Sequence, residues 1–167
     1  EALVWDGEAR NGARYDPVAD LWTPTSRVGA PPARWLHVAV WTGEAMLVWG
    51  CDAVGSGGIY HPGHDEWTPT TLDDAPIPRC GATAVWTDKF MIVWGGRSGN
   101  DYLNGGGAYR PDDNLWIKVS EENAPAPRDG HTAVWTGDSM IVWGGRDLTQ
   151  YFNTGGRYDF SNDKWAP

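Results

Sequence analysis

Residues 131–145 read HTAVWTGDSMIVWGG, two apolar runs separated by a short polar turn. The first run, residues 131–135, stops at Thr136-Gly137-Asp138, a composition typical of a tight loop between antiparallel strands. The second run, residues 140–143, is continuously apolar and ends at a glycine pair, so it predicts a strand that is buried on both faces. The stretch therefore predicts a β-hairpin whose second strand lies inside the molecule.

The same pattern returns along the chain with a period of about fifty residues. Trp22, Trp67, Trp116 and Trp165 are separated by 45, 49 and 49 residues. Other positions align at this period: Val4-Trp5, Val48-Trp49, Val93-Trp94 and Val142-Trp143; Tyr15, Tyr60, Tyr109 and Tyr158; Ala39-Val40-Trp41-Thr42, Ala84-Val85-Trp86-Thr87 and Ala133-Val134-Trp135-Thr136; Gly57-Gly58, Gly106-Gly107 and Gly155-Gly156. Self-similarity at a fixed period of this length is the signature of a repeat array.

Each repeat contains four short strand signals, which we term A to D in chain order. In the last repeat, A and B form the hairpin described above, and C is predicted at residues 155–159 after a polar loop. Residues 160–163 favour a turn, and D follows around Trp165. Four short antiparallel strands with apolar inner strands make one blade of a β-propeller. No apolar spacing typical of a helix extends beyond about one turn, so the sequence predicts an all-β fold.

These repeats resemble the kelch family of β-propellers. The resemblance rests on a Gly-Gly pair closing strand B, a Tyr in strand C, an Asp- or Asn-rich turn and a Trp opening strand D, and it covers essentially the whole chain. The tryptophan-rich sequence of these repeats is more similar to bacterial kelch arrays than to animal ones. Cys51 replaces one glycine of a pair, and Gly12-Ala13 stands in the first copy, at a cost of at most ~1 kcal/mol each. The alternative WD40 propeller is disfavoured because no blade ends in Trp-Asp.

The period divides residues 1–167, treated as one domain, into about 3.75 blades. We assign residues 1–26 to a first blade lacking strand A, residues 34–71 to the second, residues 79–120 to the third and residues 128–167 to the fourth. In kelch proteins a strand from the C-terminus commonly completes the first blade, and no such strand is predicted here. Three interpretations stay open: part of a larger propeller, two copies joined as a homo-oligomer into one ring, or a compact four-bladed ring.

Composition narrows the classes of partner. The chain has a net charge of −9 with 12 Trp and 22 Gly, and 41% of its residues are hydrophobic. We expect no membrane span, because no run of 18 apolar residues occurs. An acidic balance without a Lys/Arg cluster argues against nucleic acid and against anionic membrane surfaces. The compartment stays open, with secretion or the periplasm favoured over the cytoplasm.

The strand order places the loops between D and A, and those between B and C, on one rim of the propeller, where function usually lies. Arg34, Arg79 and Arg128 each stand just before a strand A. As a ring they could bind carboxylates through bidentate hydrogen bonds, and similar arginines in some kelch domains hold acidic peptides. The alternative, which we favour, is that each Arg ties its own loop to a neighbouring carbonyl or Asp.

The B-to-C loops differ between copies, as expected of a binding surface on a fixed scaffold. Tyr102 and Asn104 in one loop, and Tyr151 and Phe152 in another, mix aromatic and polar groups that could stack on a sugar or a peptide side chain. Equally, Tyr102 and Tyr151 could fold back onto the blade core. The expected partners are therefore a protein, an acidic peptide or a glycan.

Cysteine and histidine carry weaker signals. Cys51 and Cys80 lie on the same rim, so a disulfide is conceivable, but we expect two unrelated thiols. His37 and His131 begin strand A in two blades, with Ala82 at that place in the third. Such a set does not supply the convergent ligands of a metal site, so we expect structural histidines bonded to the backbone.

The sequence contains none of the common catalytic motifs. A Gly-x-Ser-x-Gly elbow, a Walker loop and a sialidase-type Asp box are all absent. We therefore expect a non-enzymatic binding or scaffold module with no cofactor, no metal and no catalytic residues. The alternative is part of a propeller enzyme, carbohydrate-active or similar to the copper oxidases, whose active residues lie outside this chain.

Overall fold

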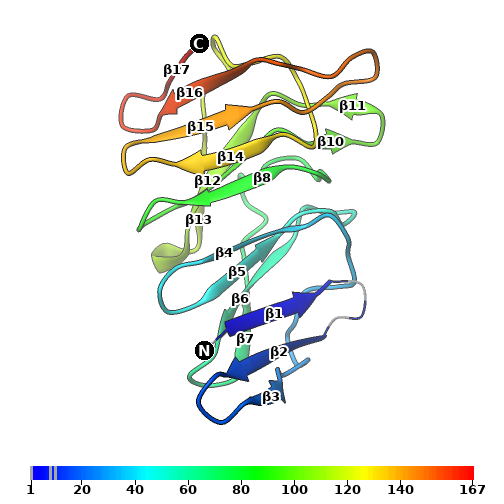
Figure 1. The fold of residues 1–167 in the computed structure, drawn as a ribbon, viewed down its shortest axis with the longest axis vertical. Coiled ribbons are helices and arrows are strands. Elements are labelled where there is room, and N and C mark those ends of the chain that lie inside the picture. The colour runs from blue at the N-terminus through cyan, green and yellow to red at the C-terminus, as the bar shows by residue number, and fades with distance from the viewer. Residues whose placement is uncertain (1, 8, 10) are drawn as a thin grey trace.

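The computed structural model describes residues 2–7, 9 and 11–167 and contains four antiparallel sheets that follow one another in chain order (Figure 1). The first has three strands, β1 (Ala2–Asp6), β2 (Asn11–Asp16) and β3 (Leu21–Pro24). The second has β4 (Val38–Trp41), β5 (Met46–Trp49), β6 (Gly57–His61) and β7 (Glu66–Pro69). The third has β8 (Thr83–Trp86), β9 (Met91–Trp94), β12 (Gly106–Arg110) and β13 (Leu115–Lys118). The fourth has β14 (Thr132–Trp135), β15 (Ser139–Trp143), β16 (Gly155–Asp159) and β17 (Lys164–Ala166).

Two small elements complete the described chain, the pair β10 (Arg97–Ser98) and β11 (Asp101–Tyr102) and a single 3-10 turn at Pro111–Asp113. Within each four-stranded sheet the strands lie side by side in the order A, B, C, D. Strand A of the third sheet, β8, contacts β4 on one side and β14 on the other. Innermost strands that converge in this way are typical of propeller blades. The predictions of an all-β fold and of four-stranded antiparallel units are confirmed.

The core lies between the sheets. Strand B of the second and third sheets, β5 and β9, is buried at every residue, as the continuous apolar runs predict. Leu47 and Trp49 pack with Met91, Val93 and Trp116 of the next sheet. Because each of the two middle sheets lies between two neighbouring sheets, the apolar side chains of its strand B are removed from water on both faces.

In the Gly-Gly pair that begins each strand C, the second glycine permits a close approach between sheets. A Cβ atom added at this position would lie 2.7 Å from the Cγ atom of a proline in the loop that enters the sheet. The pairs are Gly58 with Pro31, Gly107 with Pro76, and Gly156 with Pro125. Any larger side chain would separate the proline from the sheet surface, which explains the glycine column of the sequence.

The tyrosines that recur once per repeat take part in a hydrogen-bonded arrangement, which we call the lock. The Tyr158 hydroxyl donates to Asp163 Oδ1 at 2.5 Å, and the same oxygen accepts the backbone N–H of Ser120 at 2.7 Å. Two more sheets repeat this arrangement, with Tyr60, Asp65 and Ser26, and with Tyr109, Asn114 and Thr71. The Asp or Asn has a positive φ of 51–54°, a conformation that these two residues tolerate best after glycine. Each lock ties a turn to the sheet before it.

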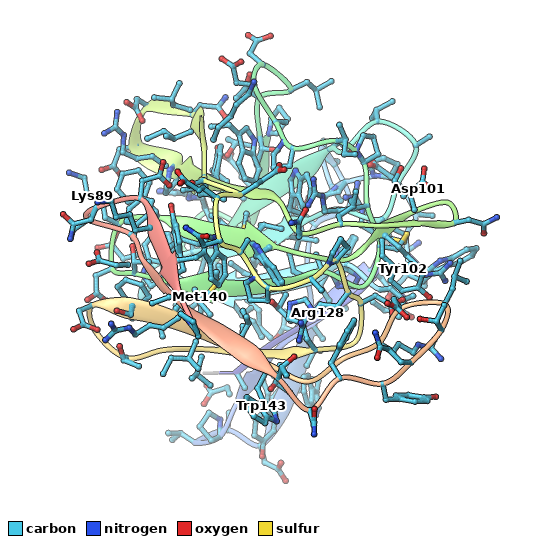
Figure 2. All side chains as sticks on the ribbon, turned by 90° about the horizontal axis from the view of Figure 1, so that it is seen from above. Lys89, Asp101, Tyr102, Arg128, Met140 and Trp143 are labelled. Atoms are coloured by element: carbon cyan, nitrogen blue, oxygen red, sulfur yellow. A yellow bond between two sulfur atoms is a disulfide. The ribbon has the colours of Figure 1, made fainter. Side chains whose placement is uncertain are left out.

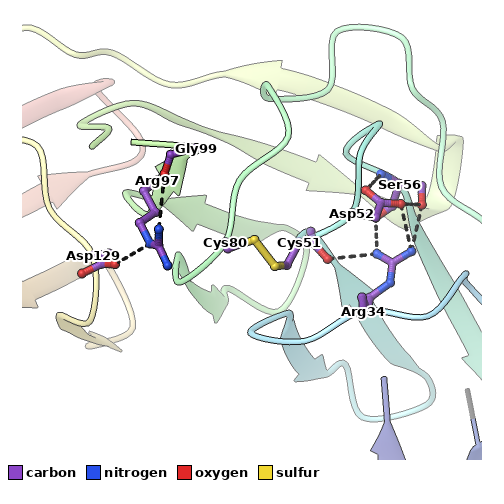
Figure 3. Close-up of a disulfide and its surroundings, with 9 residues drawn as sticks. Arg34, Cys51, Asp52, Ser56, Cys80, Arg97, Gly99 and Asp129 are labelled. Carbon is purple, nitrogen blue, oxygen red and sulfur yellow. Dashed lines mark hydrogen bonds and ion pairs between the residues drawn. A yellow bond between two sulfur atoms is a disulfide. The ribbon is translucent and has the colours of Figure 1, made fainter. Parts of the chain in front are cut away.

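Cys51 and Cys80 form a disulfide, so the expectation of two unrelated thiols was wrong (Figure 3). Their Cα atoms are 4.3 Å apart. The Cys51 N–H donates to the Arg79 carbonyl at 2.8 Å, which brings the end of β5 beside the loop that enters the third sheet. The bond therefore joins two adjacent sheets covalently.

The two strand A histidines pack against aromatic rings, and no hydrogen bond between either ring and the backbone is found among the described residues, contrary to expectation. His131 is buried, its Nε2 lies 2.8 Å from Thr83 Oγ1, and its ring meets Trp94 edge-on at 5.0 Å. His37 meets the ring of Trp5 in the same way at 4.9 Å. Each histidine thus packs against the preceding sheet.

Candidate functional site

The arginines before strand A are buried rather than arranged as a solvent-facing ring. Arg34, Arg79 and Arg128 are 3%, 6% and 1% exposed. Arg79 Nε donates to the Ile77 carbonyl at 3.1 Å, and Nη1 donates to the carbonyls of Gly95 at 3.2 Å and Gly105 at 2.6 Å. Arg34 and Arg128 make the equivalent bonds. Each guanidinium thus ties the entering loop to the end of strand B and the start of strand C.

A hollow of about 440 Å³ opens on the rim formed by the D-to-A and B-to-C loops. Its lining comes from three successive sheets: Leu36, Gly81, Arg97, Asp129, Gly130, Gly145, Arg146, Tyr151 and Phe152. Figure 2 shows Asp101 and Tyr102, from a B-to-C loop, on the opposite side of the molecule from Lys89, which lies in an A-to-B turn. Because Asp129 lies in a D-to-A loop and Tyr151 in a B-to-C loop, the hollow belongs to the rim that the strand order predicts.

One buried carboxylate holds two arginines at this hollow. Asp129 Oδ2 lies 3.1 Å from Arg97 Nε, and Oδ1 lies 3.3 Å from Arg146 Nε. The Asp129 side chain is 9% exposed, whereas those of Arg97 and Arg146 are 40% and 52% exposed. The Tyr151 hydroxyl, followed by Asp129, raises the pKa of Arg146. Two fixed guanidinium groups around one carboxylate leave a net positive charge facing solvent.

Aromatic and apolar side chains flank these arginines. Tyr151 is 81% exposed, while Phe152 is half-buried with its ring 4.2 Å from the Arg128 guanidinium carbon. Leu36 contributes an exposed aliphatic side chain from the loop of the second sheet. Of the two arrangements considered for Tyr151, the structure has the exposed one, because the ring does not fold onto the blade core.

The candidate residues do not all meet in one place. Tyr151 and Phe152 line the hollow of about 440 Å³. Tyr102 and Asn104, both half-buried, line a separate hollow of about 490 Å³ beside Arg79. Sequence reasoning missed Arg97 and Arg146, although each directly follows the glycine pair that ends strand B, a shared position that could have revealed them.

Across the described residues, no group of three or more His, Cys, Asp or Glu side chains is placed to hold a metal ion. The described part of the chain also has no helix that is both long and apolar enough to cross a membrane. The rim hollow itself presents charge-assisted donors, one buried acceptor and an exposed aromatic ring. These groups suit recognition of a carboxylate-bearing segment.

Sheets of this topology with a hollow on one rim are typical of a propeller-type binding domain. Residues 37–167 match a family model described as the KLHDC2/KLHL20/DRC7 Kelch-repeats domain. The match covers most of the chain, which therefore belongs to the kelch-repeat family. Kelch-repeat domains generally act in protein binding or scaffolding and are usually non-enzymatic. A search of curated proteins found no significant match.

Proposed function

We propose that this chain is a non-enzymatic binding module that recognises an acidic segment of a protein partner in the hollow around Arg97 and Arg146. The observation that carries the proposal is the pair of half-exposed arginines held by one buried carboxylate, Asp129. Because Asp129 orients both guanidinium groups in advance, less conformational entropy is lost when a ligand carboxylate binds. The exposed Tyr151 ring supplies apolar contact area beside the charge.

The test uses fluorescent nonapeptides that carry two or three Asp or Glu residues, beside versions with Asn or Gln in their place. We expect the acidic peptides to bind more tightly and to lose affinity as salt rises. Arg146→Ala should weaken binding about tenfold or more, the cost of losing charge-assisted bonds of roughly 1.5–3 kcal/mol. Fluorescence anisotropy at low and moderate salt measures both effects.

Arg157→Ala is the matched control, because Arg157 is an exposed arginine on β16 that does not line the hollow. It removes the same charge and should change affinity less than about twofold. Equal affinity for acidic and amide peptides would contradict the proposal. A parallel screen of neutral glycans examines Tyr151 as a stacking platform, and glycan binding that survives Arg146→Ala would favour a sugar ligand instead.

The disulfide between Cys51 and Cys80 adds an expectation about location. Structural disulfides persist mainly in oxidising compartments. We therefore infer a secreted or periplasmic location, which thiol labelling of the protein from intact cells would test. A protein recovered with both thiols free would contradict it.

A further inference from the structure

The hollow beside Arg79 has no part in the function proposed above. Its volume is about 490 Å³, and its lining includes Arg79, Tyr102, Asn104, Gly105, Lys118 and Glu121. It shares no residue with the hollow around Asp129. A negative result at one hollow therefore leaves the proposal for the other hollow standing.

The three arginines that precede strand A differ at one atom, Nη2. In Arg34 this nitrogen lies 3.1 Å from Asp52 Oδ2 and 2.8 Å from Ser56 Oγ (Figure 3). In Arg128 it lies 3.5 Å from Thr154 Oγ1, and the Phe152 ring covers the guanidinium. For Arg79, no residue that the structure describes accepts a hydrogen bond from Nη2.

The B-to-C loops explain the difference. Residues 102–105 read YLNG in the third sheet, whereas residues 151–154 read YFNT in the fourth. Gly105 thus stands where Thr154 supplies a hydroxyl, and Leu103 stands where Phe152 supplies a ring. The missing atoms open the hollow above Arg79.

Among the described residues Arg79 has no ion-pair partner of its own, although the carboxylates of Asp74 and Glu121 also line the hollow. The Arg79 side chain is nine-tenths buried. Burial lowers its pKa to about 10, partly offset by the negative charge of Glu121, so the group stays cationic at neutral pH. The unused Nη2 donor is therefore available to an acceptor that enters the hollow.

We propose that this hollow binds a carboxylate group, which accepts a hydrogen bond from Nη2 of Arg79 with Tyr102 and Asn104 as neutral donors beside it. The Glu121 carboxylate occupies the space next to Gly105, where it would collide with an added Cβ atom. It therefore competes with the ligand for the field of Arg79. The site needs no metal and no covalent step.

Acetate is the first probe, titrated against chloride at constant ionic strength and followed by the NMR signals of Arg79 Nε–Hε and the Gly105 amide. We expect a saturable shift of both signals in the unaltered protein. Gly105→Thr copies the fourth sheet, satisfies Nη2 and fills the hollow, so it should weaken acetate binding at least tenfold. Glu121→Gln removes the competing charge and should tighten binding about threefold or more.

Gly63→Thr is the matched control, because a Cβ atom at this exposed glycine meets nothing within 4 Å. It should bind acetate as the unaltered protein does. A melting curve checks that Gly105→Thr is folded. Failure of acetate to shift Arg79, or unchanged binding in folded Gly105→Thr, would overturn the proposal.

Two peptides then identify the source of the carboxylate. One carries a single Glu and an amidated C-terminus, and the other carries no acidic residue and a free C-terminus. A shift of Arg79 with either peptide supports the site and shows which carboxylate it accepts. An equal shift with a peptide that has no carboxylate at all would refute the proposal.

Discussion

At the residue scale, the repeated polar positions do more for the architecture than for ligand contact. One carboxylate oxygen of Asp163 accepts hydrogen bonds from both the Tyr158 hydroxyl and the Ser120 N–H. The buried Arg128 similarly satisfies carbonyls from two strand ends. Since every copy needs the same geometry, these recurring residues serve the scaffold, and Arg79 is a recurring residue that also lines a hollow.

Removing one hydroxyl oxygen by mutation tests the contribution of the lock to stability. Tyr158→Phe removes the buried hydroxyl that donates to Asp163, and we expect the free energy of unfolding to fall by about 1 kcal/mol. Tyr15→Phe is the matched control, because Tyr15 donates to Asp20 at an exposed position. It should change stability by less than about 0.5 kcal/mol. Urea unfolding of both variants measures the difference, and equal losses would contradict the inter-sheet role.

His131 makes stability depend on pH. Burial, followed by the charge of Arg128, lowers its pKa to about 4, below the unfolded value of about 6.5. As the pH falls from 6.5 toward 4, the unfolded chain takes up a proton that the folded chain refuses, so stability present at neutral pH is lost. Between pH 7 and pH 5 we expect a loss of about 2 kcal/mol from this group.

Chemical denaturation at pH 7 and pH 5 measures this loss. His131→Gln should remove most of the dependence, with a remainder from His37, whose pKa burial also lowers. The exposed His64 provides a control, and His64→Gln should leave the dependence unchanged. The same slope in His131→Gln as in the unaltered protein would show that another group is responsible.

At the element scale, adjacent sheets are joined on the rim by different chemistry at each junction. Between the second and third sheets the link is the disulfide of Cys51 and Cys80. Asp129 follows Arg128 just as Cys80 follows Arg79. Between the third and fourth sheets, Asp129 forms ion pairs with Arg97 and Arg146 in place of a disulfide. The ionic junction is solvent-accessible and lines the hollow.

The disulfide should contribute substantially to stability. It closes a loop with a sequence separation of 29 residues, for which the chain-entropy model gives about 3–4 kcal/mol. We expect Cys51→Gly combined with Cys80→Ala to lose about this amount, with glycine chosen because Cys51 has a φ of 54°. Thermal melting with and without reductant measures the loss. Reductant should destabilise the unaltered protein and leave the double variant unchanged, and no response in either would contradict the prediction.

At the scale of the whole molecule, the first and fourth sheets expose positions that are buried in the middle sheets. Ile141 is 39% exposed where Ile92 is fully buried, and Trp143 is 58% exposed where Trp94 is fully buried. In the first sheet, Val4 is 50% exposed. Burying one large apolar side chain is worth roughly 1.5–3 kcal/mol, so these two faces favour association with a further sheet.

We therefore expect the 167-residue chain to self-associate, as the homo-oligomer interpretation of the repeats proposes. Its mass in light scattering should rise with concentration, and Ile141→Glu with Trp143→Glu should lower the mass at a given concentration. Val18→Glu, at a loop position that is 95% exposed, should leave association unchanged. A constant monomer mass over the whole range would contradict this prediction.

Much of the fold could be predicted because its signals are local. The apolar run at residues 140–143 predicts a buried strand, and β15 (Ser139–Trp143) contains it. The glycine and tyrosine columns mark the close approaches and locks that each sheet repeats. The architectural interpretation of Arg34, Arg79 and Arg128 likewise agrees with their burial.

The site was less predictable. Arg97 belongs to the third repeat, whereas Asp129 and Arg146 belong to the fourth, and nothing in their local sequence says that one carboxylate holds both arginines. The disulfide was missed for the same reason, because the separation of Cys51 and Cys80 depends on how two sheets pack. The third repeat has Gly105 where the fourth has Thr154. The effect of this difference on Arg79 can be recognised only from the structure, in which Arg79 is buried beside Gly105.

By itself, the sequence determined the period, the strands and the apolar faces that must be covered, because hydrogen bonding along a strand and the alternation of side chains act over a few residues. Only the tertiary structure decided which rim residues meet, which arginine keeps an unused donor, and whether the two cysteines bond. Those outcomes depend on the distance and angle between neighbouring sheets, which many side chains set together and no short stretch encodes.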